Sequence, residues 1–183
     1  MLKENFYVLA GSPSAGKTSV LQALSRRGYS VVEEVPRRVI DQQNREGGDT
    51  TFLKNKEAYC DAMLLQFVAD YKQYQPMSAP VFFDRGLPDV AYAERVIKGQ
   101  ITSGVTEAIG QYRYHPRIFL FPPWQQIYQT DAYRPVNFSE AKASYDLIKA
   151  EYIGCGYEPI EMPFETLEAR VDFILDYVKD AGT

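Results

Sequence analysis

The sequence predicts a three-layer α/β domain, in which helices cover both faces of a five-stranded, mainly parallel sheet. Strand-like apolar runs alternate with helical patterns along the whole chain, which is typical of parallel strands joined by helical crossovers. The first of these runs leads directly into a glycine-containing turn that opens a helix. The 183 residues have the length of one domain and carry no repeat, linker or low-complexity segment, so we expect a single domain over 1–183.

Three of the predicted strands come from the first half of the chain. Residues 5–10 and 80–84 each contain a short apolar run of the buried-strand type, and a further strand is expected over 30–33. The helix after the first strand shows apolar residues at helical spacing until Gly28 ends the pattern. Two more helices are expected before the third strand, over 34–44 and around the four-residue repeat of Tyr59, Met63, Phe67 and Tyr71.

The second half of the chain supplies two further strands, at 117–121 and 157–161. Helical patterns lie between the later strands, at roughly 88–98, 103–112 and 139–153. A last helix carries apolar residues on one face, and Thr166 is its predicted cap. We expect these apolar faces to pack on the sheet.

Residues 11–18 read Gly-Ser-Pro-Ser-Ala-Gly-Lys-Thr and match the phosphate-loop pattern G-x-x-x-x-G-K-[ST]. The glycines let the backbone curl so that N–H groups point at phosphate oxygens, and the following helix presents its positive end to the same anion. Lys17 adds charge for the β- and γ-phosphates, and the Thr18 hydroxyl can bind Mg²⁺. An ordinary turn is the alternative, but the flanking strand and helix favour nucleotide binding by Gly11, Ser12, Ser14, Ala15, Gly16, Lys17, Thr18 and Ser19.

Charged residues follow the ends of the second and third strands, where ligands gather in open parallel sheets. Asp84 has the form of an acid that holds Mg²⁺, and its alternative role is a cap of the next helix. Glu34 can take the proton of an acceptor hydroxyl or orient the acceptor. Its alternative is a surface ion pair with Arg38. Glu33 is expected to face the other side of the strand.

Two arginines near these acids are candidates for binding the acceptor or the transferred phosphate. Guanidinium groups suit phosphate and carboxylate partners, so Arg37 and Arg85 fit this role, with Asp89 as a further substrate-binding candidate. A plain structural ion pair is the alternative for either arginine.

Residues 122–138, called the flap below, interrupt the regular alternation with a mixture of proline, aromatic and charged residues. Such a segment suits a mobile lid over a site. Arg134 can neutralise charge in a phosphoryl-transfer transition state, and Asp131 can position it, whereas solvent exposure is the alternative. Trp124 either lines the cleft or packs as a wedge.

Composition excludes several other classes. The net charge of −4 argues against a broad nucleic-acid-binding surface, and no apolar run is long enough for a membrane span. One histidine and two cysteines without metal or redox spacing exclude a zinc enzyme. No signal peptide is recognisable at residues 1–5, so a cytoplasmic protein is expected. No coiled-coil pattern indicates an oligomeric state.

Four motifs together resemble a known family. The phosphate loop, the Glu-x-x-Arg at 34–37, the Asp-Arg-Gly at 84–86 and the Asp-x-x-Arg at 131–134 occur in this order. They resemble the AAA-like P-loop family that includes the kinase domain of bifunctional nicotinamide riboside kinases, and more loosely the deoxynucleoside kinases. The resemblance covers nearly the whole chain, through residues 166–170.

The resemblance implies a small-molecule kinase fold, the P-loop NTPase fold, with strand order 2-3-1-4-5. It further implies ATP with Mg²⁺ on the phosphate loop, Glu34 near the acceptor and Arg134 as a lid residue. We do not expect the bifunctional arrangement, because no adenylyltransferase module accompanies these residues. No AAA-type sensor signature indicates a ring motor.

The leading hypothesis is therefore a kinase that transfers the γ-phosphoryl of ATP to a hydroxyl of a small, nucleoside-like metabolite. Its catalytic residues would be Lys17, Glu34, Asp84 and Arg134, with Thr18 and Asp84 on Mg²⁺. A regulatory ATPase or nucleotide switch without an acceptor is the alternative, although the Asn-Lys-x-Asp run of standard GTPases is absent. A binding module without turnover is disfavoured by the intact Lys17, Thr18 and Asp84.

Overall fold

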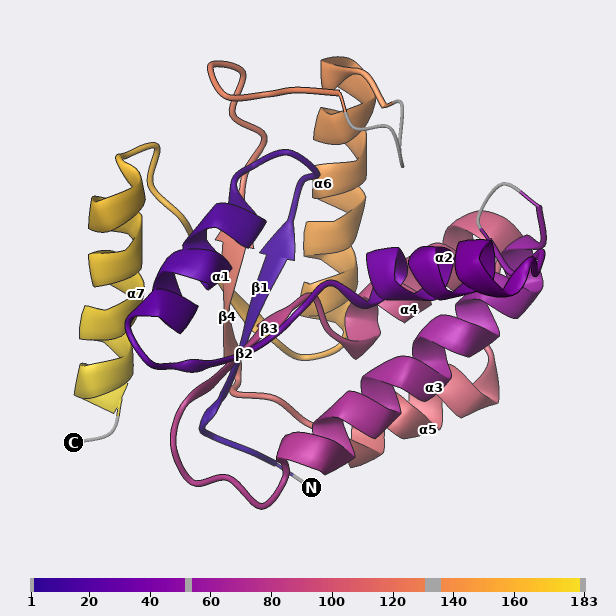
Figure 1. Cartoon of the computed structure of the whole chain (residues 1–183), viewed down its shortest axis with the longest axis horizontal. Coiled ribbons are helices and arrows are strands. Elements are labelled where there is room, and N and C mark those ends of the chain that lie inside the picture. The colour runs from indigo at the N-terminus through magenta and orange to yellow at the C-terminus, as the bar shows by residue number, and fades with distance from the viewer. Residues whose placement is uncertain (1, 52–53, 131–135, 182–183) are drawn as a thin grey trace.

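The computed structural model describes residues 2–51, 54–130 and 136–181, and it contains the predicted sheet (Figure 1). The strands are parallel and lie in the order β2-β3-β1-β4-β5. This confirms both the fold class and the strand order that the family resemblance implies. Their bounds are β1 Phe6–Gly11, β2 Ser30–Val32, β3 Val81–Asp84, β4 Arg117–Phe121 and β5 Glu158–Glu161.

The helices lie where the periodicity predicts them, with ends shifted by a few residues. The Thr166 hydroxyl accepts a hydrogen bond from the Ala169 N–H at 3.3 Å, which confirms the predicted cap of the last helix. Among the described residues, none of the helices is both long and apolar enough to cross a bilayer. Their bounds are α1 Lys17–Arg26, α2 Val35–Glu46, α3 Lys56–Tyr74, α4 Leu87–Lys98, α5 Ser103–Gln111, α6 Phe138–Gly154 and α7 Leu167–Ala181.

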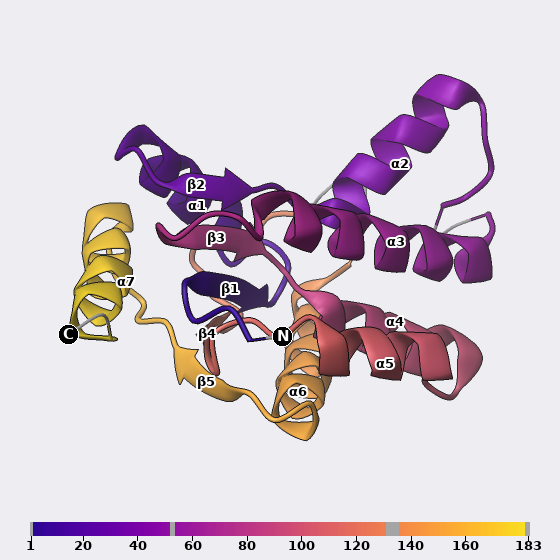
Figure 2. The ribbon, with the colours of Figure 1, turned by 90° about the horizontal axis from the view of Figure 1, so that it is seen from below.

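Two apolar cores lie on opposite faces of the sheet, because alternate side chains of a strand point to opposite faces. Tyr7 and Leu9 of β1 pack in the core under α1 and α7. Phe6 and Val8 pack in the larger core with residues of α3, α4 and α6. Figure 2 shows these two groups of helices on either side of the strands. The strands β1, β3 and β4 therefore read as nearly continuous apolar runs, since both of their faces are buried.

The phosphate loop begins at a close contact between two backbones. Gly11 ends β1 with φ +115°, and a Cβ built on it would lie 2.4 Å from the carbonyl oxygen of Phe121 in β4. The next residue, Ser12, donates its N–H to that same oxygen at 3.0 Å. Only glycine fits this position, so the start of the loop is fixed against the end of β4.

We expect Gly11→Ala to lower the free energy of unfolding by more than about 2 kcal/mol, and the melting temperature by about 5 °C or more. The methyl group would meet the fixed Phe121 backbone and would require a φ that alanine disfavours. Thermal unfolding followed by circular dichroism measures the change. Gly104→Ala is the matched control, because nothing lies within 4 Å of a Cβ there. Equal melting temperatures for the two variants would contradict this constraint.

Candidate functional site

A cavity of about 600 Å³ opens at the carboxyl ends of the strands, where the phosphate loop meets α2, the flap and α7. Its size is that of a small-molecule site. Gly11, Ser12 and Ala15 lie behind the loop surface and do not line it. The predicted site residues that line it are Ser14, Gly16, Lys17, Thr18, Ser19, Glu34, Arg37 and Arg85.

The phosphate loop has the curled backbone that its motif predicts. Ser14 has φ +56° and Gly16 has φ +84°, both in the left-handed region. Two such residues in a short loop turn successive N–H groups toward one side, which is the geometry of an anion-binding concavity. The helix α1 starts at Lys17, directly after Gly16, so its N-terminal end adds positive potential at the same place.

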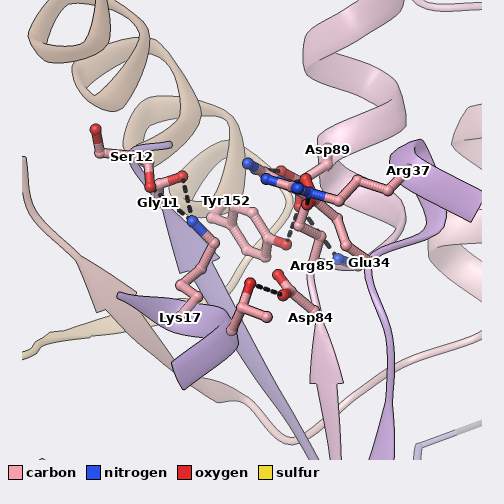
Figure 3. Close-up of polar contacts among 11 residues, drawn as sticks. Gly11, Ser12, Lys17, Glu34, Arg37, Asp84, Arg85, Asp89 and Tyr152 are labelled. Atoms are coloured by element: carbon pink, nitrogen blue, oxygen red, sulfur yellow. Dashed lines mark hydrogen bonds and ion pairs between the residues drawn. The ribbon is translucent and has the colours of Figure 1, made fainter. Parts of the chain in front are cut away.

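Lys17 is buried inside this loop (Figure 3). Its Nζ donates to the carbonyl oxygens of Ser12 at 2.6 Å and Gly11 at 3.3 Å. Burial and the nearby charge of Arg85 lower the pKa of Lys17 to about 8, although Asp84 and other carboxylates oppose the shift. The ammonium group is therefore still protonated near neutral pH and lies beside the anion site.

Asp84 lies opposite Thr18, as a shared Mg²⁺ site requires. The Thr18 Oγ1 is 3.5 Å from Asp84 Oδ2, and the buried Asp84 Oδ1 has no hydrogen-bond partner among the described residues. Oxygen ligands suit Mg²⁺, which is usually held by one or two protein groups together with phosphates and waters. The residues present therefore fit the ion. Consistently, the described residues contain no cluster of three or more histidine, cysteine or acidic side chains that would hold a metal alone.

The alternative role of Asp84 as a helix cap is wrong. The helix α4 begins after Gly86, and the Gly86 N–H donates to Asp89 Oδ2 at 3.1 Å. Asp89 thus accepts the hydrogen bond at the start of α4, and the Asp84 carboxylate is available for a ligand. Burial and the charge of Glu34 raise the pKa of Asp84 to about 6, although the nearby charges of Lys17 and Arg85 oppose the shift.

Glu34 is buried and held by two guanidinium groups. Its Oε1 accepts from Arg85 Nε at 2.9 Å, and its Oε2 accepts from Arg37 Nε at 2.7 Å (Figure 3). The predicted surface pair between Glu34 and Arg38 is therefore wrong. Arg38 turns away and pairs with Asp70 of α3 instead. Glu33 is exposed and lies in a neighbouring groove, as its place on the strand predicts.

Arg85 connects Glu34 to Asp89 across the site. Its Nη1 donates to Asp89 Oδ1 at 2.8 Å, and its backbone has φ +73°, unusual for a residue with a side chain. Burial by itself lowers the pKa of Arg85, but Asp89 and Glu34 outweigh this effect and raise it above its ordinary value. Arg85 thus forms structural ion pairs with Glu34 and Asp89, which was its alternative role. Its side chain also lines the cavity.

Asp89 does not line the cavity, contrary to the expected direct contact with substrate. It is buried behind Arg85, and its Oδ2 also accepts from the Tyr152 hydroxyl at 2.5 Å. The sequence places the charge of Asp89 near the site, but sequence alone does not show that residues of α4 and α6 surround it. From this position Asp89 holds the Arg85 side chain in place and does not reach a ligand in the cavity.

The described part of the flap contacts the phosphate loop. The Ser14 hydroxyl donates to the carbonyl oxygen of Gln129 at 2.6 Å. Trp124, Ile127, Tyr128 and Gln129 line the cavity, so Trp124 takes the first of its two predicted roles, and it also packs against Phe164. Asp131 and Arg134 lie outside the described residues, so their roles stay predictions.

Sequence reasoning missed the wall of the cavity formed by the start of α7. Glu165, Thr166, Leu167 and Arg170 line it. Arg170 is 5 % exposed and donates from Nη2 to the carbonyl oxygen of Ala15 in the phosphate loop at 2.8 Å. The sequence does contain one indication of this wall: Arg170, a charged residue, lies three positions after Leu167 and beside the apolar face of the helix.

Comparison with known proteins identifies the kind of domain. A family model described as an AAA domain matches residues 6–170 of the chain. No curated protein matches the sequence.

Several solved structures of small-molecule kinases share the fold at low sequence identity. Deoxyadenosine kinase from M. mycoides is 12% identical with a TM-score of 0.65, over 96% of this chain and 99% of that one. NadR in complex with NR is 15% identical with a TM-score of 0.68, over 95% of this chain. This chain spans 51% of the NadR chain. Shikimate kinase from Acinetobacter baumannii is 16% identical with a TM-score of 0.56, over 96% and 92% of the two chains.

We expect Asp84→Asn to stabilise the protein in a pH-dependent way. Because the pKa of Asp84 is raised from 3.8 to about 6, the folded state keeps a proton that the unfolded state releases. The wild type therefore loses stability as the pH rises through about 4 to 6. The neutral variant avoids this loss, so its melting temperature should exceed that of the wild type by on the order of 5 °C near pH 7.5 and by almost nothing near pH 4.

Scanning calorimetry with EDTA at both pH values measures the difference. Asp176→Asn, at an exposed ion pair with Lys179, is the control and should change little at either pH. A gain for Asp84→Asn that is independent of pH would show that buried charge is not its cause.

Proposed function

The chain belongs to this AAA-domain family, and from that premise we propose that it is an ATP- and Mg²⁺-dependent small-molecule kinase. It transfers the γ-phosphoryl group of ATP to a hydroxyl of a nucleoside-like or other small metabolite. The observation that carries the proposal is the buried Glu34, which faces the same cavity as Lys17 and Thr18 and is clamped by two arginines. A nucleotide switch without an acceptor has no evident use for such a carboxylate beside its phosphate site.

The phosphate loop binds the donor in this proposal. The curled backbone of Ser14 and Gly16 directs N–H groups at the phosphates, and Lys17 adds its buried charge. To reach them, the Lys17 Nζ exchanges its carbonyl acceptors, Gly11 and Ser12, for phosphate oxygens. Thr18 and Asp84 would hold Mg²⁺, which neutralises charge on the transferring phosphoryl group when bound.

Glu34 and the arginines handle the acceptor. Each carboxylate oxygen has two acceptor positions, so Glu34 can receive the acceptor hydroxyl while it keeps its contacts with Arg37 and Arg85. The acceptor oxygen forms its bond to the γ-phosphorus as the bond to the β-phosphate oxygen breaks, and the hydroxyl proton passes to Glu34. Arg85 and Arg37 hold Glu34 in place and lie close enough to bind the acceptor or its phosphate product.

The flap closes the site in the same proposal. Its described residues already contact the phosphate loop through Ser14 and Gln129. Arg134 is proposed to move toward the transferring phosphoryl group, and water exclusion by the flap would limit hydrolysis of ATP. We also propose that residues 1–183 act as one catalytic domain in the cytoplasm.

An acceptor panel tests the reaction. Purified protein with ATP and Mg²⁺ is incubated with nucleosides, pyridine nucleosides, sugars and shikimate-like polyols, and ADP release and phosphorylated product are measured by coupled assay and mass spectrometry. We expect ADP release that depends on one class of acceptor, with a product heavier by one phosphoryl group. ADP release that no acceptor changes would instead support a regulatory ATPase.

We expect Glu34→Gln to lower acceptor-dependent transfer by about 100-fold or more while the Kd for MgATP changes by less than about threefold. The amide cannot take the hydroxyl proton, whereas the phosphate loop is unchanged. Glu33→Gln, one residue earlier and exposed in the neighbouring groove, is the matched control and should leave both quantities unchanged. Equal losses of ATP affinity and turnover in Glu34→Gln would assign Glu34 to the donor side and contradict the acceptor role.

A further inference from the structure

Arg170 is a buried cation at the phosphate loop that no motif assigns. It comes from the first turns of α7 and contacts the loop at Ala15. Its guanidinium carbon lies 4.8 Å from the ring centre of Phe121 and 5.5 Å from that of Trp124. These two rings fix the plane of the guanidinium group and leave its edge directed at the loop.

The charge of Arg170 has no acidic partner among the residues that the structure describes. Among the described residues its one hydrogen-bond acceptor is the Ala15 carbonyl oxygen, and its buried Nε has no hydrogen-bond partner. Burial lowers the pKa of Arg170 with no carboxylate to offset the effect. A buried, unpaired charge costs stability, so stability alone does not account for an arginine at this position.

The contact with Ala15 determines which way the loop backbone faces. The Ala15 carbonyl and the Gly16 N–H belong to one peptide group, and in a planar trans peptide these two groups point in opposite directions. Because Arg170 holds the carbonyl toward α7 at 2.8 Å, the Gly16 N–H points the opposite way, away from α7. The N–H groups of this motif meet a phosphate on the concave side of the loop, so the contact with Arg170 helps to set the direction of one of them.

The absence of a side chain at Gly16 leaves room for the Arg170 guanidinium group. A Cβ at Gly16 would lie 2.8 Å from Arg170 Nη1, so the guanidinium group occupies the place of a side chain. The loop glycine therefore has two functions, a left-handed φ of +84° and room for the cation.

We propose that Arg170 is a positioning residue for the triphosphate of the donor: it aims the Gly16 N–H at the phosphate and supplies a further buried positive charge at the phosphate loop. This inference rests on the proposed function, because it assumes a nucleotide at the phosphate loop. The ligand group concerned is the polyphosphate and not the base.

Two ligands and three variants test the proposal. The Kd values of Mg²⁺-ATP and of Mg²⁺-tripolyphosphate, which has the phosphates but no base or ribose, are measured by titration calorimetry. The variants are Arg170→Met, Arg170→Lys and the control Arg27→Met. Arg27, at the end of α1, forms an exposed ion pair at 2.5 Å with Asp172 of α7, the helix that also carries Arg170. The described residues show no contact between the Arg27 side chain and the phosphate loop. Melting temperatures are recorded for each variant.

We expect Arg170→Met to weaken both ligands by the same factor, about tenfold or more, since a charge-assisted contact to the loop is lost. Arg170→Lys keeps the charge and should restore part of the affinity for both ligands. Arg27→Met should bind both as the wild type does. If Arg170→Met does not fold, Arg170→Lys carries the test, and equal weakening of both ligands by about threefold or more is expected.

Weakening of ATP alone would overturn the proposal, because it would place Arg170 against the base. Unchanged affinity for both ligands, with only a lower melting temperature, would also overturn it and leave Arg170 a packing residue. If the wild type itself binds neither ligand, the proposed function fails and this inference fails with it. The first two outcomes leave the proposed function standing, so the two failures are distinguishable.

Discussion

The buried guanidinium of Arg85 is the interaction on which the charged half of the cavity depends. It joins Glu34 of the β2–α2 connection to Asp89 of α4, and through Asp89 it reaches Tyr152 of α6. Three segments of the chain therefore hold their relative positions through one cation. Without it, the buried Asp89 would lose its compensating charge and Glu34 would keep only the half-exposed Arg37, which costs far more than the loss of an exposed ion pair.

Asp84 is not part of this network of ion pairs. Asp84 lies next to Arg85 in the sequence, yet in the described part of the chain its Oδ1 has no hydrogen-bond partner, and burial and the charge of Glu34 raise its pKa to about 6. The chain thus satisfies Glu34 and Asp89 internally and leaves one carboxylate for a cation. This division is typical of functional sites, where stability is reduced in favour of a group that is ready to bind. It agrees with a metal held between Thr18 and Asp84.

The phosphate loop is in turn restrained from three directions by segments that are distant in the sequence. Gly11 packs on the backbone of β4, Ser14 donates to the flap, and Ala15 accepts from Arg170 of α7. A loop held in this way loses little conformational entropy when it binds phosphate, because its N–H groups are already oriented. Under the proposed function, the flap and α7 would therefore act on the donor through the loop as well as by lining the cavity.

The sequence by itself determined the features that depend on local spacing: the elements, the phosphate loop, the cap at Thr166 and the acids at the ends of β2 and β3. These follow from apolar periodicity and from a motif whose residues are neighbours in the chain. Only the tertiary structure decided the partners of the charged side chains. Arg38 pairs with Asp70 and not with Glu34, Asp89 lies behind Arg85, and Arg170 contacts Ala15 across 155 residues. A guanidinium group can pair with any acceptor that the fold brings within reach, so its partner is set by how helices pack on the sheet.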